Sequence, residues 1–470
     1  MRKIRLGFVP LHRRGFDEKW AAEVRDSIIK VSSKLNSIEL VYSSSTLTEN
    51  GLISDENDAQ KVISLFKEKN VDGILLGTMT FGDELAGIKV AEEFYNYPLA
   101  VFGTKEPKIK PLNFKGSDSF CGTLSLTSGL YRRNIPFIFL GVLSPNEEAF
   151  SRHLENFART TAIVRDFVGA RLGVLGPRPE PFETCTYNET VMAKIFKQRV
   201  VPLTLLSLVE ESKKLSDDDH EVKATLEDFK SINVTNVPFE ELVKIAKFEV
   251  TLRKLVKEKD LDGLGIRCWT EIESYYGIFP CFVMGRLTQS GIMTSCEADI
   301  YGALTMLIQY KASLETVPPH FIDWTIMHPN LPNVFLAWHC GNAPPLLACP
   351  HYPSTLTYHS GYYKSRGIKC YGTLDTVIKP GEVTICRLTE HEGQFKMLIT
   401  KGEIIELNDA VSKEALKPGS GAWVKVDDLE KLYKTIALEG FVHHASMIHG
   451  DYSESIKQAC SILNIKIVEV

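Results

Sequence analysis

RLGFVPL (5–11) opens a series of apolar runs that decides the fold of the first third of the chain. The runs that follow are IELVYS (38–43), VDGILLG (71–77), LAVFGT (99–104) and PFIFLGVL (136–143). Segments with apolar residues at helical spacing, such as residues 17–34, lie between them. Strands that alternate with helices form βαβ units around a parallel sheet. The pattern therefore predicts a doubly wound α/β domain over residues 1–168.

A second series of the same kind begins after the helix-like segment 147–168. Its strand-like runs are ARLGVLG (170–176), RVVPLTLL (199–206) and DGLGIRC (262–268). We therefore expect a second α/β domain over residues 169–350, in tandem with the first.

The pattern of apolar runs changes after residue 350. Short β-rich runs alternate there with Pro-Gly, Glu-Gly and Lys-Gly turns, from residue 373 to residue 407. This predicts a small C-terminal domain, residues 351–470, built as an antiparallel β-barrel. The helix-like SESIKQACSIL (453–463) and the strand-like IKIVEV (465–470) close the chain and indicate a return to α/β structure.

The composition and charge of the chain limit the partners and the cellular location that we expect. The 470 residues carry 54 basic and 59 acidic side chains, a formal net charge of −5, without a long block of like charge. We therefore expect no nucleic-acid partner. We expect neither export nor membrane insertion, because the first residues are interrupted by Arg and His and no apolar run approaches the length of a membrane span. Ten cysteines without a C-x-x-C pair favour reduced thiols and a cytoplasmic location.

GIMTSCEADIYGALTMLIQYK (291–311) is the most informative segment. Its apolar residues fall on one helical face and predict a helix that begins near Glu297. Thr294 and Glu297 have the spacing of a capping box, which is the ordinary interpretation of this carboxylate. A divalent metal would use the same carboxylate as a hard oxygen ligand.

Three further segments carry candidate ligands. Asp323 lies in the strand-like HFIDWTIMH (320–328), where a turn or cap residue is the ordinary alternative. His339 ends the run NVFLAWHC (333–340), at the carboxyl end of a predicted strand, where open α/β sheets place their sites. A buried structural histidine is its alternative. His443 and His444 are adjacent, so in an extended segment they point to opposite faces and at most one enters a given pocket.

The order and spacing of these residues resemble the L-fucose isomerase and L-arabinose isomerase superfamily. Asp323 follows Glu297 by 26 positions, His339 follows 16 positions later, and a histidine pair comes near the end of the chain. SCEADIYGALTML (295–307) is the most specific part of the resemblance. Two features of the sequence differ from the family pattern. The chain is shorter than is typical of the fucose isomerase branch, and the spacing from Glu297 to Asp323 lies between the spacings typical of the two branches.

The resemblance implies two flavodoxin-like domains and a C-terminal β domain. It further implies Mn²⁺, with Co²⁺ or Mg²⁺ as substitutes, held by Glu297, Asp323, His339 and His444. Glu297 and Asp323 then also serve as the catalytic proton-transfer pair, and Asp299 beside them is a helix-start residue. A homotrimer or homohexamer is the expected assembly.

Two segments resemble the family's substrate-binding loops: GPRPEPFET (176–184) and GIRCWTE (265–271). They predict substrate contacts from Arg267, Trp269 and Glu271, and from Arg178 and Phe182, which could reach the site of a neighbouring subunit. Ordinary surface loops are the alternative for both. A pentose, a 6-deoxyhexose and an acidic or sulfonated hexose all stay open as substrate, and Arg178, Arg267 or Arg286 would favour an anionic one.

The function expected from these observations is a metal-dependent aldose–ketose isomerase that acts on a small sugar. A metal-independent sugar-binding or sensor protein is the alternative from another class, and a metal-dependent epimerase or aldolase is the alternative among enzymes. A zinc site formed by His339, Cys340, Cys349 and His351 is a further alternative, although its spacing matches no usual zinc motif.

Overall fold

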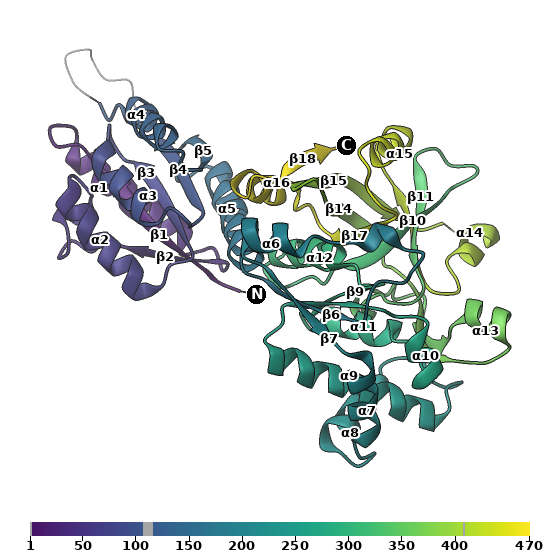
Figure 1. Cartoon of the computed structure of the whole chain (residues 1–470). Helices are drawn as coiled ribbons and strands as arrows, with labels where there is room; N and C mark the ends of the chain where they lie inside the picture. Colours follow the sequence, from purple (N-terminus) through teal and green to yellow (C-terminus); the bar gives the residue numbers. More distant parts are fainter. Residues whose placement is uncertain (1, 107–115, 408) are drawn as a thin grey trace. The chain divides into compact units, whose positions relative to one another are not determined.

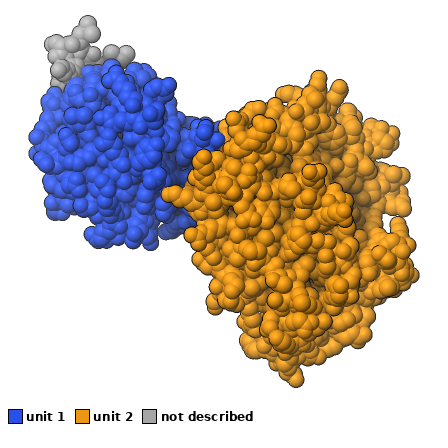
Figure 2. Space-filling model, in the orientation of Figure 1, with its two compact units in different colours: residues 1–166, 454–464 blue, residues 167–453, 465–470 orange. Residues whose placement is uncertain are grey.

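The computed structural model describes residues 2–106, 116–407 and 409–470. This part of the chain divides into two compact units, shown in Figure 2. Unit 1 contains residues 1–166 and 454–464, and unit 2 contains residues 167–453 and 465–470. The late segment 454–464 therefore belongs with the N-terminal residues and not with the strands that precede it. Within the described ranges, none of the helices combines the length and the hydropathy that a bilayer span needs.

Unit 1 is built on a parallel sheet with the strand order β2-β1-β3-β4-β5 (Figure 1). The strands are β1 (Ile4–Leu11), β2 (Ile38–Tyr42), β3 (Gly73–Thr78), β4 (Leu99–Thr104) and β5 (Ile138–Leu143). The helices are α1 (Glu18–Ser32), α2 (Glu56–Lys69), α3 (Glu84–Glu93), α4 (Ser119–Arg132), α5 (Glu148–Phe167) and α16 (Ser453–Ile462). All residues of β3 and β4 are buried, as expected of parallel strands covered on both faces. The predicted parallel α/β architecture of this region is confirmed.

Aspartates fix where the first three helices of unit 1 begin. The side chains of Asp17, Asp55 and Asp83 accept backbone N–H groups from the first turns of α1, α2 and α3. Such caps satisfy amides that have no partner within the helix. At the other end of the unit, Thr160 of α5 donates to the side chain of Gln458 at 2.9 Å, which ties α16 to α5.

Unit 2 contains a second parallel sheet, with the order β7-β6-β8-β9. Its strands are β6 (Arg171–Leu175), β7 (Arg199–Leu203), β8 (Gly263–Ile266) and β9 (Met293–Cys296). The helices of this region are α6 (Glu189–Phe196), α7 (Leu205–Lys214), α8 (His220–Phe229), α9 (Phe239–Lys259), α10 (Glu271–Tyr275), α11 (Cys281–Gln289) and α12 (Ile300–Ala312).

The remaining strands of unit 2 form a nine-stranded mixed sheet, β12-β13-β16-β11-β10-β17-β14-β15-β18. They are β10 (His320–Met327), β11 (Val334–His339), β12 (Thr355–Tyr358), β13 (Tyr371–Val377), β14 (Gly381–His391), β15 (Gln394–Ile405), β16 (Ser420–Lys425), β17 (His444–His449) and β18 (Lys466–Glu469). Helices α13 (Ser360–Arg366), α14 (Ala410–Ala415) and α15 (Leu429–Leu438) lie among them in the sequence.

Because β15 also pairs with β16, six of these strands form a closed circuit of antiparallel pairings: β16, β11, β10, β17, β14 and β15. The predicted division after residue 350 runs through this circuit, since β10 and β11 precede it. A short apolar run such as VFLAWH suits either sheet, and its sequence does not say which strand it pairs with.

Helix α12 connects the two sheets of unit 2. It packs against β8 and β9 of the parallel sheet and against β14 and β17 of the mixed sheet. Nearly all its residues are buried, which is the pattern of a helix covered on every side. The segment that precedes α12 therefore lies where the two sheets of this unit meet (Figure 1).

Candidate metal centre and active site

Glu297 lies in a strained turn between β9 and α12. Glu297 and Ala298 both have left-handed backbone conformations, with φ of 60° and 57°. Such conformations cost about 1–2 kcal/mol per residue outside glycine and concentrate at functional sites. Helix α12 begins at Ile300, three residues later than predicted. The capping-box interpretation is wrong, because Thr294 lies in β9 and Asp299 caps the helix by accepting the N–H of Gly302 at 2.9 Å.

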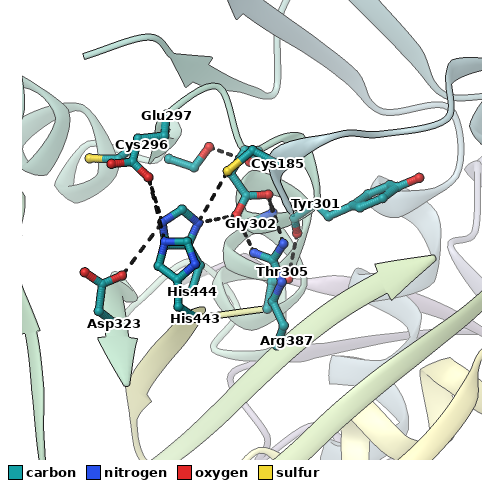
Figure 3. A network of polar contacts seen from close by, with 12 residues as sticks. Cys185, Cys296, Glu297, Tyr301, Gly302, Thr305, Asp323, Arg387, His443 and His444 are labelled. Atoms are coloured by element: carbon teal, nitrogen blue, oxygen red, sulfur yellow. Dashed lines mark hydrogen bonds and ion pairs between the residues drawn. The ribbon is translucent and has the colours of Figure 1, made fainter. Parts of the chain in front are cut away.

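Three strands of the mixed sheet bring the other candidate ligands to this turn. Asp323 on β10 pairs in register with His444 at the start of β17 and with Trp338 on β11, next to His339. The ligand atoms of Asp323, His339 and His444 lie within 4.8 Å of one another. His444 Nε2 is 3.0 Å from Glu297 Oε2 and 3.7 Å from Asp323 Oδ1 (Figure 3). Glu297, Asp323 and His339 thus lie around one point, which is marked by His444.

The atoms that face this point have no hydrogen-bond partner. They are Glu297 Oε2, Asp323 Oδ1, His339 Nε2 and His444 Nε2, all buried. Glu297 Oε2 and His444 Nε2 are close, but they do not meet in hydrogen-bond geometry. Buried polar atoms are almost always satisfied, and leaving one unpaired is costly. Two carboxylates and imidazole suit a divalent ion such as Mn²⁺, so the residues present fit the metal that the sequence predicts.

A buried ion pair between Asp299 and Arg387 fixes the orientation of the His444 ring through its Nδ1 atom. His444 Nδ1 donates to Asp299 Oδ2 at 2.8 Å, and the Arg387 guanidinium donates to both oxygens of Asp299. Each of these side chains is 1% exposed. Burial opposes a charged Asp299, but Arg387 and His444 hold its pKa well below the usual range. Burial opposes a charged His444 too, yet its bond to Asp299 and the nearby Cys185 and Glu297 raise its pKa well above the usual value.

In the neutral ring, the contact with Asp299 keeps the proton on Nδ1 and leaves the Nε2 lone pair of His444 for a metal. Histidines that bind metals are typically fixed in this way. Sequence reasoning placed Asp299 at a helix start, where it is, but missed that it orients a candidate ligand. No sequence pattern connects Asp299 with Arg387, which lies 88 positions away on β14.

His443 lies closer to the site than the sequence predicts. The two adjacent rings were expected on opposite faces, yet their centroids are 4.0 Å apart. His443 Nε2 lies 4.0 Å from Glu297 Oε2. The prediction is wrong because His443 precedes β17, so the alternation of a strand does not apply to it. Burial and the neighbouring His444 lower the pKa of His443.

A cavity of about 680 Å³ opens beside the four ligand candidates. Trp269, Glu297, Asp323 and His339 are among the residues that line it. The indole Nε1 of Trp269 donates to Glu297 Oε1 at 3.2 Å. Phe182 contacts the edge of Trp269, with ring centroids 5.6 Å apart, and lies 5.4 Å from the ring of His443. Two of the predicted substrate contacts, Trp269 and Phe182, therefore lie at the site of their own chain.

The other predicted substrate contacts lie outside the lining of this cavity. Arg267 forms an ion pair with Glu271 at 2.6 Å. Arg178 donates to backbone carbonyls of its own loop. Arg286, considered for an anionic substrate, is paired with Glu249 on α9 and Asp228 on α8. Sequence reasoning missed Arg366, which ends α13 and lines the cavity. Nothing in its local sequence marks it, because only the fold brings α13 to the site.

Cysteine thiols lie around the Nδ1 atom of His339. Its Nδ1 lies 3.3 Å from the sulfur of Cys340 and 3.9 Å from that of Cys296, and Cys281 lies 3.6 Å from Cys340. The zinc set suggested by spacing does not form, because Cys349 packs in a separate apolar cluster with Val334, Leu336 and their neighbours. Bonds from Cys281 and Cys296 and the charge of His339 lower the pKa of Cys340. Burial opposes a charged His339, but Cys340 and Asp323 raise its pKa to about 9.

Comparisons with known proteins agree with this architecture. Residues 7–168 match the fucose/sulfoquinovose isomerase N-terminal domain, and residues 337–470 match the L-fucose isomerase C-terminal domain. The sulfoquinovose isomerase of Priestia megaterium is 24% identical over 98% of this chain and 97% of its own. That of Alkalicoccus urumqiensis is 25% identical over 85% of this chain and 86% of its own. The chain is thus an isomerase that belongs to the fucose isomerase-like family.

Proposed function

We propose that this protein is a metal-dependent aldose–ketose isomerase whose ion is held by Glu297, Asp323 and His444. The observation that carries the proposal is the convergence of their buried, unpaired atoms at one point beside a cavity. Mn²⁺ is the expected ion, with Co²⁺ or Mg²⁺ as substitutes. His339, the fourth predicted ligand, faces the same point.

In the proposed reaction C2 of the aldose loses a proton and C1 gains one, while a hydroxyl proton moves from O2 to O1. Glu297 and Asp323 are the general base and acid, because both have an oxygen at the point of convergence. A bound divalent ion supplies Lewis-acid stabilisation of charge on the sugar oxygens. Trp269 holds the Glu297 carboxylate through Oε1, which leaves Oε2 directed at the site. Asp299 fixes the imidazole of His444.

We further propose that the substrate is a sugar with an anionic substituent, such as a sulfonated hexose. The relatives named above are sulfoquinovose isomerases. Arg366 is the only lysine or arginine among the described residues that line the cavity. It is exposed, and within the described part of the chain its guanidinium makes no hydrogen bond or ion pair. A sulfonate or carboxylate would supply that missing partner.

The finer features of the fold belong to the same proposal. The strand order of unit 1 supports a flavodoxin-like domain, and the closed circuit of six strands supports a β-barrel. We propose a second flavodoxin-like domain around the parallel sheet of unit 2, and a homotrimeric or homohexameric assembly. Analytical ultracentrifugation tests the assembly directly.

Removal of the metal tests the proposed function. We expect dialysis against EDTA to abolish conversion of sulfoquinovose to its 2-ketose, and added Mn²⁺ to restore it. Turnover in D₂O is expected to place deuterium at C2 of the aldose and C1 of the ketose, because the transferred proton passes through a carboxyl group. Tight sugar binding without turnover, unaffected by EDTA, would favour a binding protein, and epimers or cleavage fragments would indicate another enzyme class.

Replacing Arg366 tests the anionic substrate. We expect Arg366→Ala to raise KM for a sulfonated hexose by roughly 10- to 100-fold, since a charge-assisted hydrogen bond contributes about 1.5–3 kcal/mol. Arg366→Lys retains the charge and is expected to recover part of the loss. Conversion of the matching neutral hexose serves as the control and should be unchanged. An equal loss on both sugars would show that Arg366 does not recognise the anion.

A further inference from the structure

The two nitrogens of His339 have opposite surroundings. Nδ1 accepts the backbone N–H of Cys340 at 2.9 Å and lies near the thiols of Cys340 and Cys296. Nε2 is buried without a hydrogen-bond partner, and the ring lies in one group of possible metal ligands with Asp323 and His444. The first nitrogen thus lies among hydrogen-bond donors, whereas the second has no protein partner.

These surroundings fix where the ring carries its proton. A neutral imidazole has one N–H and one lone pair, so acceptance of the Cys340 N–H by Nδ1 puts the proton on Nε2. In that tautomer Nε2 bears hydrogen and offers no lone pair to a metal.

His444 shows the opposite arrangement. Its Nδ1 donates to the Asp299 carboxylate at 2.8 Å, so its Nε2 has the free lone pair that a metal ligand needs. The two histidines converge on the same point, with ring centroids 6.1 Å apart, but only His444 has an acceptor behind it. The group that contacts Nδ1 therefore determines the role of Nε2. An acceptor at Nδ1 makes Nε2 of His444 a metal ligand, and a donor at Nδ1 makes Nε2 of His339 a hydrogen-bond donor.

We propose that His339 is not a metal ligand but a catalytic residue that donates its Nε2–H to O1 or O2 of the sugar. This inference rests on the proposed isomerase function and refines it. Three protein ligands would remain for the ion, and a bound sugar could supply further oxygen ligands. His339 is 3% exposed. A hydrogen-bond donor in a site that excludes water stabilises the negative charge that develops on a substrate oxygen.

The test compares His339 and His444 with matched substitutions. We would measure Mn²⁺ affinity by isothermal titration calorimetry, and kcat and KM at saturating Mn²⁺, for His339→Gln, His339→Leu and His444→Gln. We expect both His339 variants to bind Mn²⁺ within about threefold of the wild type, and His444→Gln to bind it at least about 10-fold more weakly. The kcat of His339→Leu is expected to fall by roughly 10²- to 10³-fold, with part recovered in His339→Gln, whose amide N–H₂ reaches the position of Nε2.

Two results would overturn the inference. Loss of Mn²⁺ affinity in the His339 variants equal to that in His444→Gln would show that His339 is a ligand. An unchanged kcat in His339→Leu would show that it is no catalytic donor. Wild-type protein that binds no Mn²⁺ would instead refute the proposed function, and with it this inference. Near-UV circular dichroism of each variant verifies the fold, and the titration itself needs no turnover.

Discussion

At saturating Mn²⁺, Glu297→Gln is expected to lower kcat by about 10²- to 10⁴-fold, the usual contribution of a positioned general base. Glutamine retains the shape of the side chain, and its carbonyl can still accept the indole N–H that Trp269 now donates to Glu297 Oε1. The strained turn and the wall of the cavity should therefore persist. What is lost is a group that can accept a carbon-bound proton and the negative charge that faces His444 Nε2.

The measurement combines kinetics with isotope exchange. Glu297→Gln should lose deuterium incorporation from D₂O in parallel with kcat, because both depend on the same proton transfer. Glu23→Gln, the same chemical change on an exposed side chain of α1, is the control and should behave as the wild type. A Glu297→Gln enzyme that turns over normally and still exchanges deuterium would assign the proton transfer to another group.

Local patterns in the sequence were enough to place each candidate ligand in or beside a short apolar run, but only the family resemblance marked these residues as ligands. Glu297, Asp323 and His444 each follow or lie in a short apolar strand, and the structure brings all three together. The alternation of strands and helices predicted the parallel sheets for the same reason, because the period of apolar residues is a local property. The pairing of strands is not local. This is why β10 and β11, predicted to lie outside the C-terminal β domain, belong to the sheet that positions Asp323 and His339.

Local sequence patterns could not identify the residues that orient the candidate ligands. Asp299 reads as a helix cap from its neighbours, and it is one. Its other partners, Arg387 and His444, lie 88 and 145 positions away on separate strands of the mixed sheet. The donors behind His339 likewise include Cys296, which belongs to the other sheet. Such contacts follow from tertiary packing, which no single segment encodes.

We expect Asp299→Asn to destabilise the protein by about 3–5 kcal/mol, the usual cost of removing one partner of a buried ion pair. Asp299 and Arg387 are each 1% exposed, so the guanidinium would lose its counter-charge without gaining water. Asparagine is itself a good helix cap and can still accept the Gly302 N–H, so loss of the cap does not account for the effect. Urea denaturation of metal-free protein at pH 7 measures the change.

The pH dependence of stability identifies the charge as the cause. Burial alone would raise the pKa of Asp299, but Arg387 and His444 depress it below the value of an unfolded aspartate. A carboxyl group with a depressed folded pKa contributes stability that is complete above its unfolded pKa, about 3.9, and that is lost as the pH falls towards the folded pKa. The difference between wild type and Asp299→Asn should therefore be largest at neutral pH and shrink below about pH 4. A difference that does not vary with pH would assign the loss to packing.

Removing both charges separates stability from metal binding. In Asp299→Leu/Arg387→Met no buried charge is left unpaired, and such replacements are often neutral or stabilising. We expect this double variant to recover most of the stability lost in Asp299→Asn, less about 0.5–2 kcal/mol for the missing helix cap. His444 would still lack the acceptor that holds its Nδ1 proton, so Mn²⁺ affinity should stay about 10- to 100-fold below that of the wild type. If stability and metal affinity recover together, Asp299 acts on the metal only through the fold. If stability alone recovers, the carboxylate orients the ligand directly, as its 2.8 Å contact with His444 Nδ1 indicates.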